Sequence, residues 1–259
     1  MFDHDAQGGA AAYTSARGSW AWRAKSAYAA TARTAGKALV AVKMLPSTPP
    51  PKERRIKHWL ISLTKVHDSL AIAELGVPWW TYRAIDFVEA WLLARPKPVR
   101  AFEWGSGAST FWLADRVDEV YSVEHHEGFA EMMRSELAKL SKVTFLEVGA
   151  PHSFAPRVGS RKIGSTELDF HDYVHAIDTV QGDFDLVVVD GRAREACMRI
   201  AADRLSPGGL IIFDNSHRQR YKAAIASSGL HERSFGGLTP TLPYPDRTSV
   251  LSKASSSSG

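Results

Sequence analysis

Residues 101–110, which read AFEWGSGAST, carry residue types that could hold a nucleotide-like ligand. A glycine–serine–glycine turn in the middle is too tight for most side chains, and its glycines allow backbone N–H groups to approach a ligand. Two hydroxyl residues follow at the expected start of a helix, where unpaired N–H groups offer further donors. The predicted ligand contacts are therefore Gly105, Ser106, Gly107, Ser109 and Thr110.

A carboxylate that could bind a ribose follows this turn. Glu124 lies 17 residues after Gly107, at the end of the next apolar run. That is where a ribose-binding acid is found in nucleotide-binding α/β proteins. His125 comes next in the chain and is expected to line the same pocket. The turn, the helix start and the acid together favour a bound ligand over an ordinary tight turn.

Two details distinguish the ligand from a dinucleotide. The third glycine of a dinucleotide fingerprint is replaced by Thr110. Glu103 precedes Gly105 by two residues, and a carboxylate there would repel a pyrophosphate. It would instead suit a ligand with a positive end, such as the ammonium and sulfonium groups of S-adenosylmethionine. The sequence therefore favours S-adenosylmethionine as the cofactor.

Acidic residues also end two later apolar runs, FDLVVVD and LIIFD. Asp190 and Asp214 are the last residues of these runs. Since ligands bind beyond the carboxyl ends of strands in open α/β sheets, we expect both to share one crevice with Glu103 and Glu124. Asp190, Asp214 or the nearby His217 could remove a proton from a hydroxyl group of an acceptor, so these three are the candidate catalytic residues.

The same acids allow other interpretations. Asp190, Asp214 and Asn215 offer oxygen ligands that could bind a divalent cation, which would lower the pKa of an acceptor hydroxyl. Alternatively, Asp190 caps a helix, and Asp214 and Asn215 cap the helix that runs through Tyr221. The sequence favours both a catalytic base and helix capping over a metal site.

Composition sets the broad class. The chain has 259 residues, 44% of them hydrophobic and 23% charged, which is ordinary for a globular protein with a sizeable core. The formal net charge is +4, and residues 6–52 hold seven Lys or Arg and no Asp or Glu. Cys197 is the single cysteine, which excludes an intrachain disulfide framework. No apolar run approaches the length of a membrane span.

Apolar runs alternate with amphipathic stretches over most of the chain, which predicts a parallel sheet with helices on both faces. We expect strands at 99–104, 119–124, 143–148, 184–190 and 209–214. We expect helices at 53–70, 81–94, 109–116, 128–140, 170–180, 193–205 and 218–228, with Thr81 as a helix cap.

Three regions follow from these patterns. Residues 1–50 are expected to form a basic, Ala-rich extension, which packs on the domain, lies on a membrane surface, or acts as an organelle-targeting segment. Residues 51–251 are expected to form one catalytic domain, of which residues 51–95 form an N-terminal helical cap. Residues 252–259 are expected to be a disordered Ser-rich tail. A cytoplasmic location is expected, and the oligomeric state is left open.

With these residues in hand, the chain resembles the class I S-adenosylmethionine-dependent methyltransferases over roughly residues 75–251. It is most similar to a bacterial group of poorly defined substrate that is often found near glycan or capsule genes. The resemblance is carried by the segments PWWTY at 78–82, FEWGSGAST at 102–110, SVEHH at 122–126, VVVDGRAREAC at 187–197 and GGLIIFDNSHRQRY at 208–221, and by FGG at 235–237 and RTSV at 247–250.

The resemblance implies a Rossmann-like fold with a mostly parallel sheet of seven strands and helices on both faces. It places Glu103, Gly105 and Gly107 near the methionine part of the cofactor and Glu124 on the ribose hydroxyls. It places Asp190 opposite the transferred methyl group. The metal triad of catechol-type O-methyltransferases is similar to Asp190, Asp214 and Asn215, but Arg192 and Arg194 stand where that family has a lysine.

The predicted activity is methyl transfer, with an oxygen of a small-molecule or glycan acceptor as the expected target. The residues expected to line the acceptor site are Trp79, Trp80, Tyr82, Asn215 and Arg218. The loop 149–169 carries Arg157, Arg161 and Lys162, which could meet an acidic acceptor or simply face solvent. Nucleic acid is disfavoured because VVVDGR lacks the Asn/Asp-Pro-Pro-aromatic motif of base-amino methylation. A dinucleotide-dependent oxidoreductase and a non-catalytic cofactor-binding protein remain the alternatives.

Overall fold

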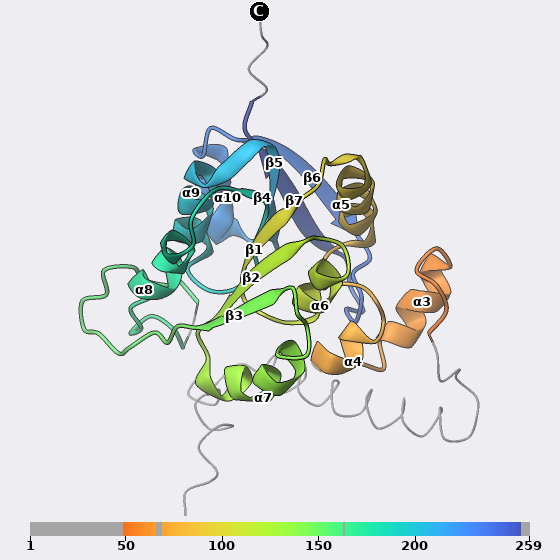
Figure 1. The fold of residues 1–259 in the computed structure, drawn as a ribbon, viewed down its shortest axis with the longest axis horizontal. Coiled ribbons are helices and arrows are strands. Elements are labelled where there is room, and N and C mark those ends of the chain that lie inside the picture. The colour runs from red at the N-terminus through yellow and green to blue at the C-terminus, as the bar shows by residue number, and fades with distance from the viewer. Residues whose placement is uncertain (1–48, 66–68, 163, 255–259) are drawn as a thin grey trace, which may run out of the picture.

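The structure is a computed structural model that describes residues 49–65, 69–162 and 164–254. The Ala-rich extension, apart from its last two residues, and residues 255–259 of the predicted tail lie outside the described residues. A twisted sheet forms the centre of the molecule, with helices packed on both faces (Figure 1). None of the described helices is long and apolar enough to cross a membrane.

Seven strands form the sheet, in the order β3-β2-β1-β4-β5-β7-β6. β7 is antiparallel to both of its neighbours, and the pairs among β1 to β5 are parallel. The predicted fold, a mostly parallel seven-stranded sheet of Rossmann-like type, is therefore confirmed. The strands are β1 Arg100–Trp104, β2 Glu119–Glu124, β3 Val143–Glu147, β4 Phe184–Val189, β5 Leu205–Asp214, β6 His231–Gly237 and β7 Asp246–Ser252.

The helices follow the predicted alternation with three differences, one of which is that α4 Ser69–Ala73 was not predicted as a separate helix. The helix expected at 170–180 is a short α-helix followed by a 3-10 helix, and the helix expected at 53–70 ends at Ser62. There the Ser62 and Thr64 hydroxyls donate to the carbonyls of Trp59 and Ile61, which competes with helix continuation. The helices are α3 Arg55–Ser62, α4 Ser69–Ala73, α5 Tyr82–Ala94, α6 Ala108–Ala114, α7 Glu127–Leu137, α8 His171–Val174, η1 His175–Thr179, α9 Arg194–Asp203 and α10 Gln219–Ala226.

Two apolar cores lie on opposite faces of the sheet, and side-chain alternation along each strand divides residues between them. On β4, Leu186 and Val188 pack in the core with α5 and α6, whereas Val187 and Val189 pack in the core with α8, η1, α9 and α10. Strands buried on both faces read as continuous apolar runs, which is why FDLVVV signalled a central strand.

The segment before the sheet is fixed to the loop between β6 and β7. The Trp59 indole donates to the carbonyl of Leu242 at 2.9 Å, and the Trp79 indole donates to the Thr241 hydroxyl at 2.9 Å. The backbone N–H of Thr81 donates to the Thr248 hydroxyl on β7 at 3.1 Å. These contacts place the start of α5 beside the carboxyl end of β5.

Candidate functional site

The turns that follow β1 and β4 lie against each other at the carboxyl edge of the sheet. Gly105 has φ +96°, a left-handed conformation that favours glycine. A Cβ on Gly105 would come within 2.8 Å of the Gly191 backbone, and a Cβ on Gly191 would overlap the Tyr173 hydroxyl. The sequence interpretation assigned the turn glycines to ligand approach. The structure shows a second reason at Gly105, which is close packing of two backbones.

Glu103 lies beneath this turn. Alternation along β1 directs its carboxylate to the face covered by α6, where it is fully buried. The hydroxyls of Ser109, Thr110 and Ser122 all donate to it, the last two at 2.5 and 2.8 Å. The predicted direct contact between Glu103 and the positive end of the ligand therefore does not match this packing. Glu103 instead holds the start of α6 in place.

Ser106, in the turn, belongs to the same hydrogen-bond network around Glu103. Its hydroxyl lies 2.6 Å from that of Ser122, and Thr110 accepts the backbone N–H of Gly107 at 3.0 Å. The hydroxyls of Ser109 and Thr110 donate to Glu103, so these side chains stabilise the turn. The Gly105 N–H donates to the Val123 carbonyl and the Gly107 N–H to Thr110, so among the described residues the donors left for a ligand are the Ser106 N–H and the first N–H groups of α6.

Burial raises the pKa of Glu103 to about 7, against the opposing effect of the three hydroxyl donors. In the unfolded chain the carboxyl releases its proton near pH 4.5. Between pH 4.5 and 7 the folded chain therefore holds a proton that the unfolded chain has lost. The contribution of Glu103 to stability is full below pH 4.5 and is lost as the pH rises to 7.

We predict that Glu103→Gln removes this pH dependence. The difference in unfolding free energy, wild type minus variant, should fall on the order of 1–3 kcal/mol between pH 4.5 and 7. Urea denaturation at several pH values measures it. Glu147→Gln is the control, because Arg134 donates to Glu147 and holds its pKa below the usual range. A difference for Glu103→Gln that stays constant with pH would contradict the assignment.

Glu124 is the last residue of β2, and only one of its two carboxylate oxygens accepts hydrogen bonds from the described part of the protein. Its Oε1 accepts the backbone N–H groups of His125 and His126 at 2.8 and 2.7 Å, and His125 Nδ1 lies 2.8 Å from the same atom. Among the described residues, no hydrogen bond reaches Oε2. Burial raises the pKa of Glu124, but these contacts outweigh it and hold the pKa below its ordinary value. The carboxylate is therefore charged, fixed, and able to accept from a ribose.

His125 forms an aromatic wall beside Glu124. Its ring lies 5.5 Å from the ring of Phe170 and 5.4 Å from that of Tyr173, measured between centroids. The Tyr173 hydroxyl is buried without a hydrogen-bond partner among the described side chains and backbone. An orphaned buried donor beside Gly191 and His125 is a group that a bound ligand could satisfy.

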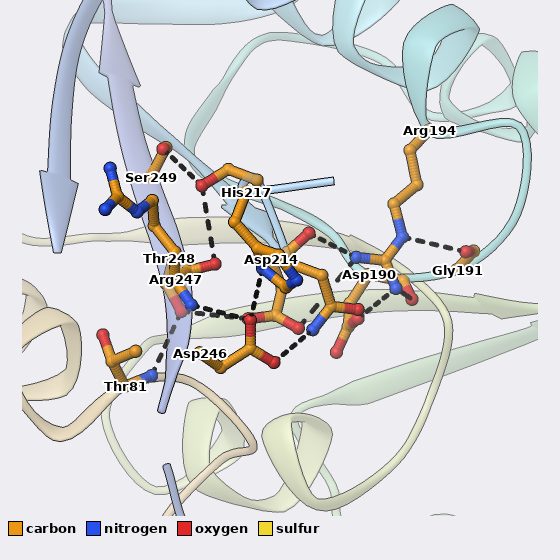
Figure 2. Close-up of polar contacts among 12 residues, drawn as sticks. Thr81, Asp190, Gly191, Arg194, Asp214, His217, Asp246, Arg247, Thr248 and Ser249 are labelled. Carbon is orange, nitrogen blue, oxygen red and sulfur yellow. Dashed lines mark hydrogen bonds and ion pairs between the residues drawn. The ribbon is translucent and has the colours of Figure 1, made fainter. Parts of the chain in front are cut away.

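Arg194, the first residue of α9, lies between the two acids that end β4 and β5 (Figure 2). Its Nη2 lies 2.6 Å from Asp190 Oδ1, and its Nη1 lies 4.0 Å from Asp214 Oδ2 and donates to the Asp214 carbonyl. Burial raises the pKa of Asp190, with Arg194 opposing the shift. Burial and then the neighbouring Asp190 hold the pKa of Asp214 well above its ordinary value.

These contacts do not fit the metal site considered for Asp190, Asp214 and Asn215. The Arg194 guanidinium lies 2.6 Å from the Asp190 carboxylate and 4.0 Å from the Asp214 carboxylate, so it already supplies the positive charge that a shared cation would bring. The Asn215 side chain is turned away, because its amide donates to Asp246 at 2.9 Å. Within the part of the chain that the structure describes, no group of acids, histidines and cysteines is arranged to hold a metal ion.

Asp246, at the start of β7, is a site residue that the sequence interpretation missed. It is buried, and its Oδ1 lies 2.8 Å from His217 Nδ1 (Figure 2). His217 itself is half exposed, at 49% of its side-chain area. Asp246 lies 29 positions after His217 in the sequence and belongs to no recognisable motif. The antiparallel pairing of β7 with β5 brings the two residues together. The pair is an imidazole oriented by a carboxylate, which is the arrangement of a general base.

Of the residues predicted to line the acceptor site, some lie in the core and others lie close to the acids. Trp80 and Tyr82 are fully buried in the core with α5 and α6, so they are packing residues and do not form an acceptor surface. Trp80 packs edge-on against Trp112, and the Tyr82 hydroxyl lies 2.6 Å from His58 Nδ1. Trp79 is half-buried and bonded to Thr241.

Two lining candidates lie close to the acids. Asn215 follows Asp214 with φ +52° and contacts Asp246, and Arg218 is the cap residue of α10. Burial and the neighbouring Arg194 lower the pKa of Arg218. Thr248 accepts from the Thr81 backbone and donates to Asp214 Oδ1 at 2.9 Å. The segment before α5 is thus joined to the acids by one hydroxyl, and not by its aromatic side chains.

Comparison with known proteins identifies a matching family model and similar solved structures. Residues 102–216 match a family model described as a methyltransferase domain. No curated protein matches the chain. Similar solved structures include an rRNA methylase from Streptococcus thermophilus, with 12% identity, TM-score 0.45, and coverage of 65% of this chain and 95% of that one. A methyltransferase-like protein from Silicibacter pomeroyi has 23% identity, TM-score 0.42, and coverage of 64% and 84%.

The matched segment begins in β1 and ends just after β5, so it contains the glycine turn, Glu124, Asp190 and Asp214. The sheet order and the antiparallel β7 were established independently of this match. Residues 102–216 of this chain therefore match a methyltransferase domain, in agreement with the resemblance found in the sequence.

Proposed function

We propose that this protein transfers a methyl group from S-adenosylmethionine to an oxygen of a small-molecule or glycan acceptor, with His217 as the general base. The observation that carries the proposal is the contact of 2.8 Å between His217 Nδ1 and the buried Asp246. It lies at the same edge of the sheet as Asp190 and the glycine turn.

The fixed groups around the crevice support binding of the cofactor. Glu124 offers an unengaged carboxylate oxygen for the ribose hydroxyls, and His125 offers a ring beside it. The backbone N–H of Ser106 and the first N–H groups of α6 offer further donors. When bound, the cofactor supplies a methyl group already activated on a sulfonium, so the chain needs mainly to position the partners and exclude water.

His217 is better placed than either acid to take the proton of an acceptor hydroxyl. Asp214 is almost fully buried, and its two oxygens are oriented toward Thr248 and Arg194. Asp190 is held by Arg194 at 2.6 Å. His217 exposes about half of its side chain, and Asp246 fixes its ring so that the other nitrogen is available to an acceptor. Asp190 and Arg194 would then lie next to the reacting groups.

An oxygen acceptor is the chemistry that needs such a base. A hydroxyl group must lose its proton during methyl transfer, and an imidazole is the usual group for this near neutral pH. The turn after β4 reads Asp190–Gly191–Arg192, without the prolines and aromatic residue expected for methylation of a base amine. This favours a small hydroxylated acceptor over nucleic acid.

The test is an acceptor screen with the full chain and methyl-labelled S-adenosylmethionine. Hydroxylated sugars, phenols, and their amine and thiol counterparts would be compared by release of S-adenosylhomocysteine and transfer of label. We expect turnover with one class of hydroxyl compound. Turnover confined to amines or to RNA would contradict the proposed acceptor class, and cofactor binding without turnover on any acceptor would favour a non-catalytic role.

A further inference from the structure

A cavity of about 180 Å³ lies beside Arg194. Three segments form its walls: the loop between β3 and α8, the first turns of α9, and the start of α10. Most of its charged side chains are basic, and Glu195 is its single acidic one. The basic residues of the wall are Arg157, Arg161, Lys162, Arg194, Arg199 and Arg220.

The acids in and around the cavity compensate only part of this charge. Glu195 accepts from Arg161, and Asp190 pairs with Arg194. Arg199 is exposed and forms no ion pair with the residues that the structure describes. Arg220 has a buried Nε without a hydrogen-bond acceptor among those residues, and its guanidinium lies over the ring of Tyr221. Two cations therefore face the cavity without an anionic partner.

The chain places further positive potential at the same point. Burial, and then the neighbouring Arg192 and Arg194, lower the pKa of Lys162 to about 7. The α9 helix begins at the cavity wall, and its cap residue Ala193 provides no side-chain acceptor for the first N–H groups. Uncapped N–H groups at a helix start favour an anion. The side chains and the helix thus favour the same kind of ligand.

We propose that this cavity is a subsite for a phosphate group carried by the methyl acceptor. The inference rests on the proposed function, because it concerns the same reaction and names the acceptor's charged end. Arginine guanidinium groups bind phosphate through paired hydrogen bonds, and a doubly charged group matches the two uncompensated cations. Arg194 borders the cavity and also contacts Asp190. A phosphate held there leaves the attached acceptor beside the reacting edge of the sheet.

The first experiment measures phosphate binding by calorimetry, with the full chain saturated with S-adenosylhomocysteine at low ionic strength. Inorganic phosphate should bind, and acetate should not. Arg199→Gln and Arg220→Gln should each weaken phosphate binding, and the double variant should weaken it about tenfold or more, since each removes a charge-assisted hydrogen bond. Arg83→Gln, an exposed arginine of α5, is the control and should leave the affinity unchanged. Binding unaffected by the double variant would overturn the proposal.

The second experiment distinguishes free phosphate from phosphate on the acceptor. In the acceptor screen, sugar phosphates should be methylated in preference to the parent sugars, and the double variant should lose that preference through a raised KM with little change in kcat. Equal use of both forms by the wild type would overturn the assignment to the acceptor. Binding of S-adenosylhomocysteine is measured in a separate titration. Its absence would contradict the proposed function and would leave the phosphate subsite to be judged from phosphate binding alone.

Discussion

Replacing Glu124 with alanine is expected to weaken binding of S-adenosylhomocysteine about a hundredfold. The loss corresponds to two charge-assisted hydrogen bonds from ribose hydroxyls, each worth about tenfold or more in affinity. The geometry supports this size of effect because Oε1 is anchored by the N–H groups of His125 and His126, which leaves Oε2 to the ligand. Calorimetric titration with S-adenosylhomocysteine measures the change.

Two further variants separate the charge of Glu124 from its structural contacts. Glu124→Gln keeps an acceptor for the backbone N–H groups but removes the charge, so a smaller loss of about tenfold is expected. Glu147 pairs with Glu124 in the register of β2 and β3, yet it is exposed and bound by Arg134. Glu147→Gln should therefore bind the ligand normally. Normal binding by Glu124→Ala would refute the ribose assignment.

Replacing His217 with alanine is expected to lower turnover by about two to three powers of ten, the usual worth of a general base. Cofactor affinity should stay within a factor of about two, because His217 lies on the β5–α10 connection, away from Glu124 and the glycine turn. Asp246→Asn should lower turnover about tenfold or more by removing the charge that orients the imidazole. Both are read as kcat for the best acceptor of the screen.

The matched control is a second histidine–aspartate pair elsewhere in the chain. His175 Nδ1 lies 2.7 Å from Asp178 Oδ2 on η1, and both side chains are largely exposed. His175→Ala removes the same kind of pair without touching the carboxyl edge of β5 and β7, so it should retain full turnover. If His217→Ala retains full turnover as well, His217 is not the base. A loss of equal size in both variants would point to a general effect on stability.

The sequence predicted the sheet well because its strands are buried on both faces. Runs such as FDLVVV need no long-range information, and the acids that end them must lie at one edge of a parallel sheet. β6 was not predicted as a separate strand for the opposite reason. It is an edge strand whose first four residues are exposed, so His231–Ser234 carry no apolar pattern.

The site was harder to predict where a role depends on which way a side chain points. Glu103 precedes the turn as a cofactor contact would, but alternation along β1 directs it beneath the turn. Trp80 and Tyr82 precede the sheet and were expected to line the acceptor site, but they pack in the core. Asp246 could not be found from spacing, because its contact with His217 arises from long-range pairing of two strands.

We propose that the glycine turn, Glu124 and His125 together bind S-adenosylmethionine. Calorimetric titration of the full chain with S-adenosylhomocysteine and with NAD tests it most directly. We expect saturable binding of S-adenosylhomocysteine at one site per chain and no binding of NAD. Binding of NAD without binding of S-adenosylhomocysteine would contradict it.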